Sequence, residues 1–312
     1  MIHSPVMDQD RSIGRLSHAE VTHAGQAYRL GRYAIHFHLL GNVTKSYVKG
    51  CSVHISFNRA VNIHNTHNLL VEHNVIYNTM GGSFFLEDGL EINNIIQYNL
   101  AVFVKSSTSL LNDDITPAAF WVTSPNNIIR HNYAAGGTHF GFWYRMHGHP
   151  DGPSFTPDIC PDKEPLGVFY NNTVHSQGWY GIWIFENYFP MENGACGGGR
   201  PEPAKFYSLT AWNNQKGAEW VNCGACQFID FTMVNNEQIG IDMKSISVPE
   251  WGQAGVFGGY IIGYVDALNE TGSTHCQSSG LALPYSQKMV VNGTTFINHD
   301  RSCCAMSIGA GG

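Results

Sequence analysis

Two stretches of the chain decide its fold: HNYAAGGTHFGFWYR at residues 131–145 and NNTVHSQGWYGIWIF at residues 171–185. They align without a gap, so that Trp143 matches Trp183 after 40 residues. Further copies of the pattern occur at 35–38 (IHFH), 51–64 (CSVHISFNRAVNIH), 74–87 (NVIYNTMGGSFFLE), 119–123 (AFWVT), 218–222 (AEWVN) and 240–244 (GIDMK). Self-similarity at an irregular period of roughly 22 to 40 residues predicts a solenoid.

The repeated units are predicted to be β-strands joined by loops of variable length. They consist of short β-branched and aromatic runs separated by Asn and Gly, which is typical of strands. A variable period is expected when the strands are kept and insertions fall in surface loops. Left-handed backbone is tolerated by Asn, so Asn58, Asn78 and the pairs Asn171–Asn172 and Asn213–Asn214 are expected at the corners of the solenoid.

Alternation along each strand sorts its side chains into two columns, because successive residues point to opposite faces. One parity is apolar and is predicted to face the core, with Glu219 as its odd member; it contains Ile35, Phe37, Val61, Ile63, Phe84, Leu86, Phe120, Val122, Phe142, Tyr144, Ile182, Ile184, Ile241 and Met243. The other parity mixes charge, imidazole and indole, so it is predicted to face outward. Neighbouring strands would place its members about 4.8 Å apart.

Composition agrees with one elongated β domain. We expect residues 1–312 to form a single parallel β-helix of roughly nine or ten rungs, with residues 1–14 and 309–312 as frayed ends. Charged residues make up only 13% of the chain, and the net charge is −7. A chain without Lys/Arg clusters is not expected to bind nucleic acid. It also contains no run of about 18 apolar residues, so no membrane insertion by this segment is expected.

Sequons and cysteines point to an extracellular chain. Sequons for N-glycosylation stand at Asn42, Asn171, Asn269 and Asn292. Cys160 and Cys196 each follow a repeat strand on adjacent rungs, so they are the first pair expected to form a disulfide. The Cys223–Cys226 CxxC has no second CxxC beside it, which favours a structural role over zinc. Since no secretory signal opens the sequence, we expect a piece of a longer secreted or membrane-anchored chain.

Seven stretches carry a family resemblance. They are GRYAIHFHLLG (31–41), NRAVNIHNTHNLLVEHNVIYN (58–78), GGSFFLEDG (81–89), LAVFVKSSTSLLNDDITPAAFWVTSPNN (100–127), GTHFGFWYRMHGHPDGPS (137–154), NNTVHSQGWYGIWIFENYFPM (171–191) and NNQKGAEWVN (213–222). They resemble the fibrocystin-L-like family, which includes fibrocystin, the cell-migration-inducing hyaluronan-binding protein and the transmembrane hyaluronidase. The resemblance covers roughly residues 15 to 308. It implies a right-handed parallel β-helix of pectin-lyase type, with long inserted loops, in a large extracellular or cell-surface protein.

A polar strip on the outward face is the first candidate site. His36 and His38 share the outward parity of one strand, His64 is predicted one rung beyond His38, and Glu87 follows one rung beyond His64. Together with Asp88 these side chains offer a divalent-metal site or an acid and base for sugar chemistry. Arg145, two rungs beyond Glu87, suits an anionic sugar carboxylate. The alternative is a polar ladder that only supports the fold.

His147, His149 and Asp151 form a second, weaker metal candidate, in a turn-rich loop. Solvated-loop behaviour is the alternative for these three residues. No obligatory cofactor is expected, and calcium is the ion left open; the chain has no EF-hand pattern.

An aromatic strip beside the polar one is the second candidate site. It is predicted to contain Phe85, Trp121, Trp143, Trp183 and Trp220. Indole faces commonly stack on sugar rings. The alternative is that the insertions at 104–118, 146–168 and 186–205 cover the strip, since a patch of four exposed Trp is rare in monomers.

Three functions remain open at this point. The chain is expected to present its outer face to a glycan, with hyaluronan as one candidate, or to an extracellular protein, without catalysis. A hyaluronan-degrading enzyme that uses His38, His64, Glu87, Asp88 and Arg145 is the alternative, and a structural spacer in a long ectodomain is the second alternative. An open groove with Arg145 at its floor would favour a polyanionic glycan, while a buried Trp column would favour the spacer.

Overall fold

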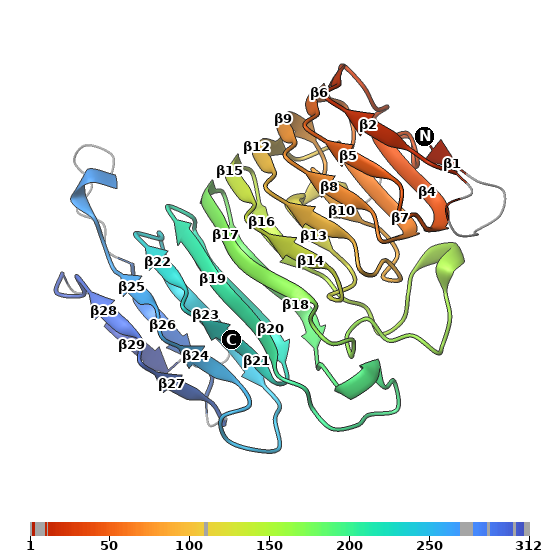
Figure 1. Cartoon of the computed structure of the whole chain (residues 1–312). Helices are drawn as coiled ribbons and strands as arrows, with labels where there is room; N and C mark the ends of the chain where they lie inside the picture. Colours follow the sequence, from red (N-terminus) through yellow and green to blue (C-terminus); the bar gives the residue numbers. More distant parts are fainter. Residues whose placement is uncertain are drawn as a thin grey trace.

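A computed structural model describes residues 2–3, 10, 12–108, 112–268, 277–285, 288–301 and 304–308 of the chain. Its strands pair in parallel and stack as the coils of a parallel β-helix, as predicted (Figure 1). Short helical turns interrupt the loops: α1 (Asn112–Ile115), η1 (Gly152–Ser154), η2 (Glu192–Gly194) and η3 (Asp266–Leu268). Among the described residues, no helix has the length and hydropathy required to cross a membrane.

The first sheet has eleven strands, which follow one another in chain order from one end of the helix to the other. They are β1 (Ile2–His3), β4 (Ile35–Asn42), β7 (Val61–His67), β10 (Phe84–Leu86), β13 (Ala118–Val122), β16 (Phe140–Tyr144), β18 (Tyr180–Tyr188), β20 (Lys216–Cys223), β23 (Ile239–Ile246), β26 (Ser279–Leu283) and β29 (Cys304–Ile308). The stretch expected to fray at the start of the chain thus includes β1, which pairs with β4. Residues 309–312 lie outside the described residues.

The second sheet is built from two parallel ladders that merge in the long strands β17 (Val168–Gln177) and β19 (Ala204–Trp212). One ladder contains β2 (Arg15–Ser17), β5 (Tyr47–Lys49), β8 (Leu70–Glu72), β11 (Ile95–Gln97), β14 (Ile128–Arg130), β21 (Cys226–Ile229), β24 (Gly255–Phe257) and β27 (Val290–Asn292). The other contains β3 (Glu20–Thr22), β6 (Ser52–Ser56), β9 (Val75–Met80), β12 (Leu100–Lys105), β15 (Tyr133–Gly137), β22 (Thr232–Val234), β25 (Tyr260–Ile262) and β28 (Thr295–Ile297).

One continuous hydrophobic core fills the space between the sheets. Apart from Glu219, the predicted inward residues of the first sheet, from Phe37 through Phe84, Phe120 and Phe142 to Ile241, belong to it. The rings of Phe84, Phe120 and Phe142 stack on successive strands at centroid distances of 4.9 and 4.7 Å. The apolar parity therefore gave the core face correctly over most of the chain.

Trp220 is an exception, because its predicted outward position is wrong. It pairs in register with Ile184 and Met243 and lies fully buried in the core, whereas Glu219 aligns with Trp183 on the outer column. The prediction matched indole with indole and thereby slipped β20 by one residue, which turns every side chain to the opposite face.

The true register of β20 follows a column of glycines. A Cβ on Gly181 would lie 2.4 Å from the carbonyl oxygen of Gly217, and one on Gly217 would lie 2.5 Å from that of Gly240. Both distances are too short for any other residue, so the strands can only stack in this way with glycine at these positions.

Buried asparagines form a ladder along one corner of the helix. The amide of Asn74 donates to the carbonyl oxygen of Asn99 (3.0 Å), Asn99 donates to Asn132 (3.1 Å), and Asn132 donates to Asn172 (3.2 Å). Each amide also donates to a backbone carbonyl of the preceding coil, for example Asn99 to Val71. Asn171, which precedes Asn172, has a positive φ of 50°, as predicted for a corner asparagine.

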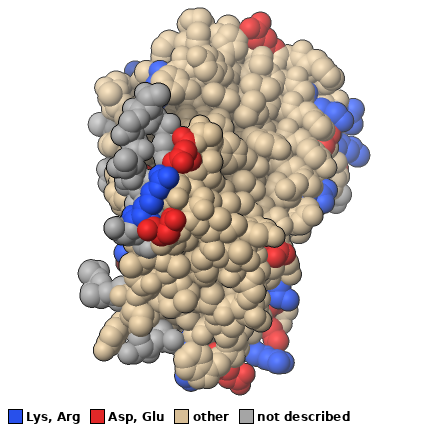
Figure 2. Space-filling view, turned by 90° about the vertical axis from the view of Figure 1, so that its left-hand side faces the viewer, with Lys and Arg blue, Asp and Glu red and all other residues tan. Residues whose placement is uncertain are grey.

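Cys160 and Cys196 form the predicted disulfide bond, which joins the loops that follow β16 and β18. Both members of the CxxC, Cys223 and Cys226, are buried in the core. On the face of the molecule that Figure 2 shows, charged residues occur in small groups among uncharged ones.

The asparagine ladder should stabilise the fold measurably. Asn99→Ala removes an amide that donates to Val71 and Asn132 and whose oxygen accepts from Asn74, so it leaves several buried polar groups without partners. We expect a loss of about 3 kcal/mol in the free energy of unfolding, measured by chemical denaturation. Replacement of the exposed Gln238 by Ala is the control and should change it by less than about 0.5 kcal/mol. Equal losses in the two variants would contradict this role.

Candidate functional site

The outward faces of β4, β7 and β10 bring the predicted polar strip together. His36 pairs with Asn62 and His38 with His64, while Asn62 in turn pairs with Phe85 on β10. The backbone N–H of Glu87 donates to the carbonyl oxygen of Ile63, which places Glu87 beside His64. The predicted order of His38, His64 and Glu87 on successive rungs is therefore the order in the structure.

These residues form the floor of a cleft of about 570 Å³. Its walls come from two loops, one before β4 and one that follows β16. The lining residues are Leu30, Gly31, His36, His38, Arg59, His64, Phe85, Glu87, Asp88, Asp151, Gly152 and Pro153. Of the three long insertions, 146–168 thus lines the cleft, through Asp151, Gly152 and Pro153.

His64 lies between two carboxylates. Its Nδ1 is 3.3 Å from Oε2 of Glu87, and its Nε2 is 2.6 Å from Oδ2 of Asp88. Burial lowers the pKa of His64, but the Asp88 carboxylate in close contact with its Nε2 and the negative charge of Glu87 outweigh it, so the pKa is raised. Asp88 is fixed in turn by the hydroxyl of Ser154, which donates to its Oδ2 at 2.5 Å.

The imidazole of His36 is held in a different environment. It is 1% exposed, and its Nδ1 lies 3.1 Å from the carbonyl oxygen of Gly31. Its Nε2 points toward Glu87 at 3.8 Å and makes no hydrogen bond. Burial lowers the pKa of His36 to about 4, although the charge of Glu87 acts in the opposite direction. His36 is therefore neutral at physiological pH.

Glu87 is the centre of the polar network. Its Oε1 accepts from the hydroxyl of Tyr33 at 3.1 Å and lies 3.4 Å from the guanidinium of Arg59, and its Oε2 accepts from the amide of Asn62 at 2.6 Å. Arg59 is itself buried and is paired with Asp114 at 2.8 Å. The predictions missed Tyr33, Arg59 and Asn62. Asn62 has the outward parity of the strip, whereas nothing in the sequence links Arg59 to Asp114.

The aromatic strip exists but is mostly covered. On successive strands, Phe85 stacks on Trp121 at a centroid distance of 5.0 Å and Trp143 packs tilted against Trp121 at 4.3 Å; the three are 1%, 1% and 5% exposed. Trp183, at the end of the strip, is partly buried and donates to Glu219 at 2.9 Å. Residues of the same sheet close over the strip, among them Ala118, Phe140, Tyr180 and Phe185. The strip is a second hydrophobic cluster outside the main core.

Arg145 lies over this covered strip and not at the floor of the cleft. Its guanidinium is 5.7 Å from the ring of Trp121 and 5.8 Å from that of Trp143, and it contacts His147. Arg145 and His147 line a separate cavity of about 190 Å³ with Phe185 and the residues that follow it. The predicted groove with Arg145 at its floor is therefore not the one that the histidines line.

The second predicted metal group does not converge. His147 Nδ1 lies 3.2 Å from Asp151, whereas His149 Nδ1 faces the carbonyl oxygen of Ile159 and the sulfur of Cys160. That sulfur already belongs to the disulfide.

Among the predicted glycosylation sites, Asn171 and Asn292 are exposed and Asn42 is partly buried, while Asn269 lies outside the described residues. Their modification stays a prediction.

Comparison with known protein families identifies the class of the chain. The family model described as CEMIP beta-helix matches residues 3–182, which include all of the strands under the cleft. The chain belongs to this family.

Among individual proteins, Fibrocystin-L of Mus musculus is 60% identical over 97% of the chain, and Fibrocystin-L of Homo sapiens is 58% identical over 99%. The human cell surface hyaluronidase CEMIP2 is 34% identical over 58% of the chain and 15% of its own length. The chain is thus fibrocystin-L-like, and it spans about 7% of the length of the two fibrocystin-L relatives.

A buried acid beneath the cleft should make stability depend on pH. Burial raises the pKa of Glu91 to about 6, although backbone N–H donors, among them that of Asn65 at 2.8 Å, act in the opposite direction. Because the folded state favours protonated Glu91, the raised pKa stabilises the fold fully at pH values below 4.5, the ordinary pKa of a glutamate. This stabilisation is lost as the pH rises through about 6.

Chemical denaturation of the native chain and of Glu91→Gln tests this coupling. Between about pH 4.5 and pH 7.5 we expect the native chain to lose on the order of 2 kcal/mol more unfolding free energy than the variant. Any constant cost of the substitution cancels in this comparison. An identical pH dependence in the two proteins would show that Glu91 does not titrate in this range.

Proposed function

We propose that the chain is part of a cell-surface or extracellular protein and binds a glycan of the hyaluronan class in the cleft above β4, β7 and β10, without cleaving it. The observation that carries this proposal is the cleft itself. Its volume of about 570 Å³ is within the usual range for small-ligand sites. The exposed apolar side chains of Leu30 and Pro153 line the cleft together with imidazoles and carboxylates, which suits a sugar ring with its apolar faces and its hydroxyls.

The names of the relatives support the ligand class. Human CEMIP2 is a cell surface hyaluronidase, and the human cell migration-inducing and hyaluronan-binding protein is 31% identical over 69% of the chain. Two members of the family are therefore named for hyaluronan. The rest of a larger ectodomain, or another extracellular protein, would be the further partner of this segment.

The position of Arg145 outside the cleft and the covered aromatic strip do not support the proposal. Burial of Trp121 and Trp143 removes them as a stacking surface for sugars, and taken alone it favours a structural spacer. A spacer has no need of a framed cleft with several buried polar groups at its floor. The cleft therefore favours recognition over the spacer.

Hyaluronan cleavage is the second candidate function. The observation that favours it is the position of His64, with carboxylate oxygens of Glu87 and Asp88 at 3.3 and 2.6 Å from its two nitrogens. An imidazole between two carboxylates is suited to transfer protons to and from a glycosidic oxygen.

Retention of fluorescent hyaluronan by the immobilised chain, with and without calcium, tests recognition. Leu30→Ala removes a side chain that is 70% exposed on the rim of the cleft. The loss of roughly 40 Å² of apolar contact amounts to about 1 kcal/mol, so we expect roughly fivefold weaker binding. Tyr285→Ala removes a similarly exposed side chain, at 71%, on a distant coil and should leave binding unchanged. No retention by the native chain, or equal effects of the two substitutions, would contradict the proposal.

The length of the hyaluronan chains after the same incubation separates the two candidates. Recognition without catalysis predicts that the chains keep their length. Shortened chains, with shortening abolished by Glu87→Gln, would instead support cleavage at His64.

A further inference from the structure

We propose that the cleft floor is a metal site, in which His36, His38 and His64 bind a divalent transition-metal ion and Glu87 supplies the fourth ligand. Zn²⁺ is the ion that this donor set fits best. The inference concerns the floor of the cleft alone and does not depend on whether a glycan binds above it.

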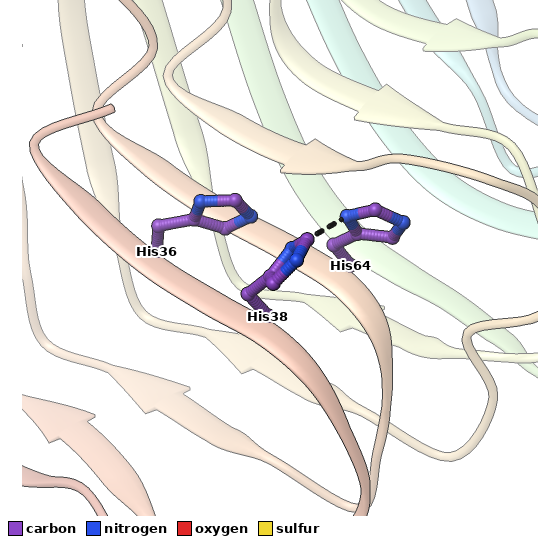
Figure 3. A group of neighbouring side chains, drawn as sticks. All are labelled: His36, His38 and His64. Atoms are coloured by element: carbon purple, nitrogen blue, oxygen red, sulfur yellow. Dashed lines mark hydrogen bonds between the residues drawn. The ribbon is translucent and has the colours of Figure 1, made fainter. Parts of the chain in front are cut away.

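The three imidazoles converge on one point (Figure 3). One nitrogen of each lies within 4.8 Å of the others, and Nδ1 of His38 is 3.0 Å from Nδ1 of His64. Around tetrahedral Zn²⁺, with Zn–N bonds of about 2.0–2.1 Å, two ligand nitrogens lie about 3.4 Å apart. The spacing of His38 and His64 is therefore already close to that of zinc ligands, and the nitrogen of His36 lies at most about 1.4 Å farther from the other two than zinc ligands would.

The buried nitrogen of His36 is the strongest sign of a missing ligand. A backbone carbonyl can only accept a hydrogen bond, so the contact with Gly31 places the proton of His36 on Nδ1. This leaves a lone pair on Nε2, which is buried, makes no hydrogen bond and points toward Glu87. A buried polar atom without a partner is destabilising by about 1–3 kcal/mol. A metal ion at this position would use the lone pair.

Second partners orient the ligands as they do in known metal sites. Metal-bound histidines almost always direct their other ring nitrogen to a carboxylate or a backbone carbonyl. His36 has the carbonyl of Gly31, and His64 Nε2 has the carboxylate of Asp88 at 2.6 Å, which Ser154 holds in place. With Asp88 at Nε2, the Nδ1 of His64 is the nitrogen that faces His38.

Glu87 lies beside two of the three imidazoles. Its Oε2 lies 3.3 Å from Nδ1 of His64 and 3.8 Å from Nε2 of His36. Hydrogen bonds from Tyr33 and Asn62 fix the carboxylate in this position. Three imidazoles and one carboxylate suit Zn²⁺ and its transition-metal neighbours, whereas Ca²⁺ prefers oxygen ligands alone. The calcium left open by the sequence does not fit this cluster.

Titration calorimetry of the chelator-treated chain with Zn²⁺, and with Co²⁺ for its visible spectrum, tests the site. We expect one Zn²⁺ to bind per chain, and the Co²⁺ complex to show the absorption of a tetrahedral ion. His38→Ala should abolish stoichiometric binding, and Asp88→Asn should weaken it by roughly 10- to 100-fold while the ligands remain. Titration with Ca²⁺ should give no binding at this cluster.

Matched controls separate this site from chance binding by histidine. His54→Ala removes a half-exposed histidine that pairs with Glu20 on the other sheet, and it should bind Zn²⁺ as the native chain does. Circular dichroism checks that each variant is folded. If His38→Ala does not fold, Asp88→Asn still tests the site, because it leaves all four ligands in place. Absence of Zn²⁺ binding by the native chain, or unchanged binding in folded His38→Ala and Asp88→Asn, would overturn the proposal.

Discussion

The parallel hydrogen-bonded register between successive coils is the constraint on which the rest of the structure depends. It puts equivalent positions of distant repeats next to each other, so that residues 26 apart, such as His38 and His64, become lateral neighbours. The core ring stack, the asparagine ladder and the cleft floor are three results of the same stacking. A slip of one residue in any strand would turn its core side chains outward and remove its contribution to each of them.

Much of the fold could be predicted from the sequence because the repeats carry their own register. The alternation of Phe84, Phe120 and Phe142 with Phe85, Trp121 and Trp143 gave both faces of three strands correctly. The error at Trp220 shows which signal matters more. An indole can be accommodated on either face, but Gly217 must stack on Gly181 and Gly240, because a Cβ would collide with a neighbouring carbonyl. Backbone approach, rather than side-chain similarity, fixes the register there.

The candidate site was only partly predictable, since it combines strand positions with loop positions. His36, His38, His64 and Glu87 follow from parity and register, and Asp88 follows only from its place next to Glu87 in the sequence. Arg59, Tyr33 and Ser154 reach the same network through contacts between segments far apart in the chain, such as Arg59 with Asp114 and Ser154 with Asp88. The sequence also left the cover of the aromatic strip open, because that cover depends on how Phe140 and Tyr180 pack against the indoles.

Disulfide cross-linking between coils measures the register most directly. His38→Cys combined with His64→Cys places two thiols on directly opposed residues, about 4.8 Å apart and within the range of a disulfide. His38→Cys combined with Asn62→Cys keeps both thiols on the same face but offsets them by two residues, to about 8 Å, which is beyond that range. We predict rapid oxidation of the first pair, detected by mass spectrometry of the linked peptides, and none of the second. Equal cross-linking of both pairs, or of the offset pair alone, would contradict the register and with it the convergence of the three histidines.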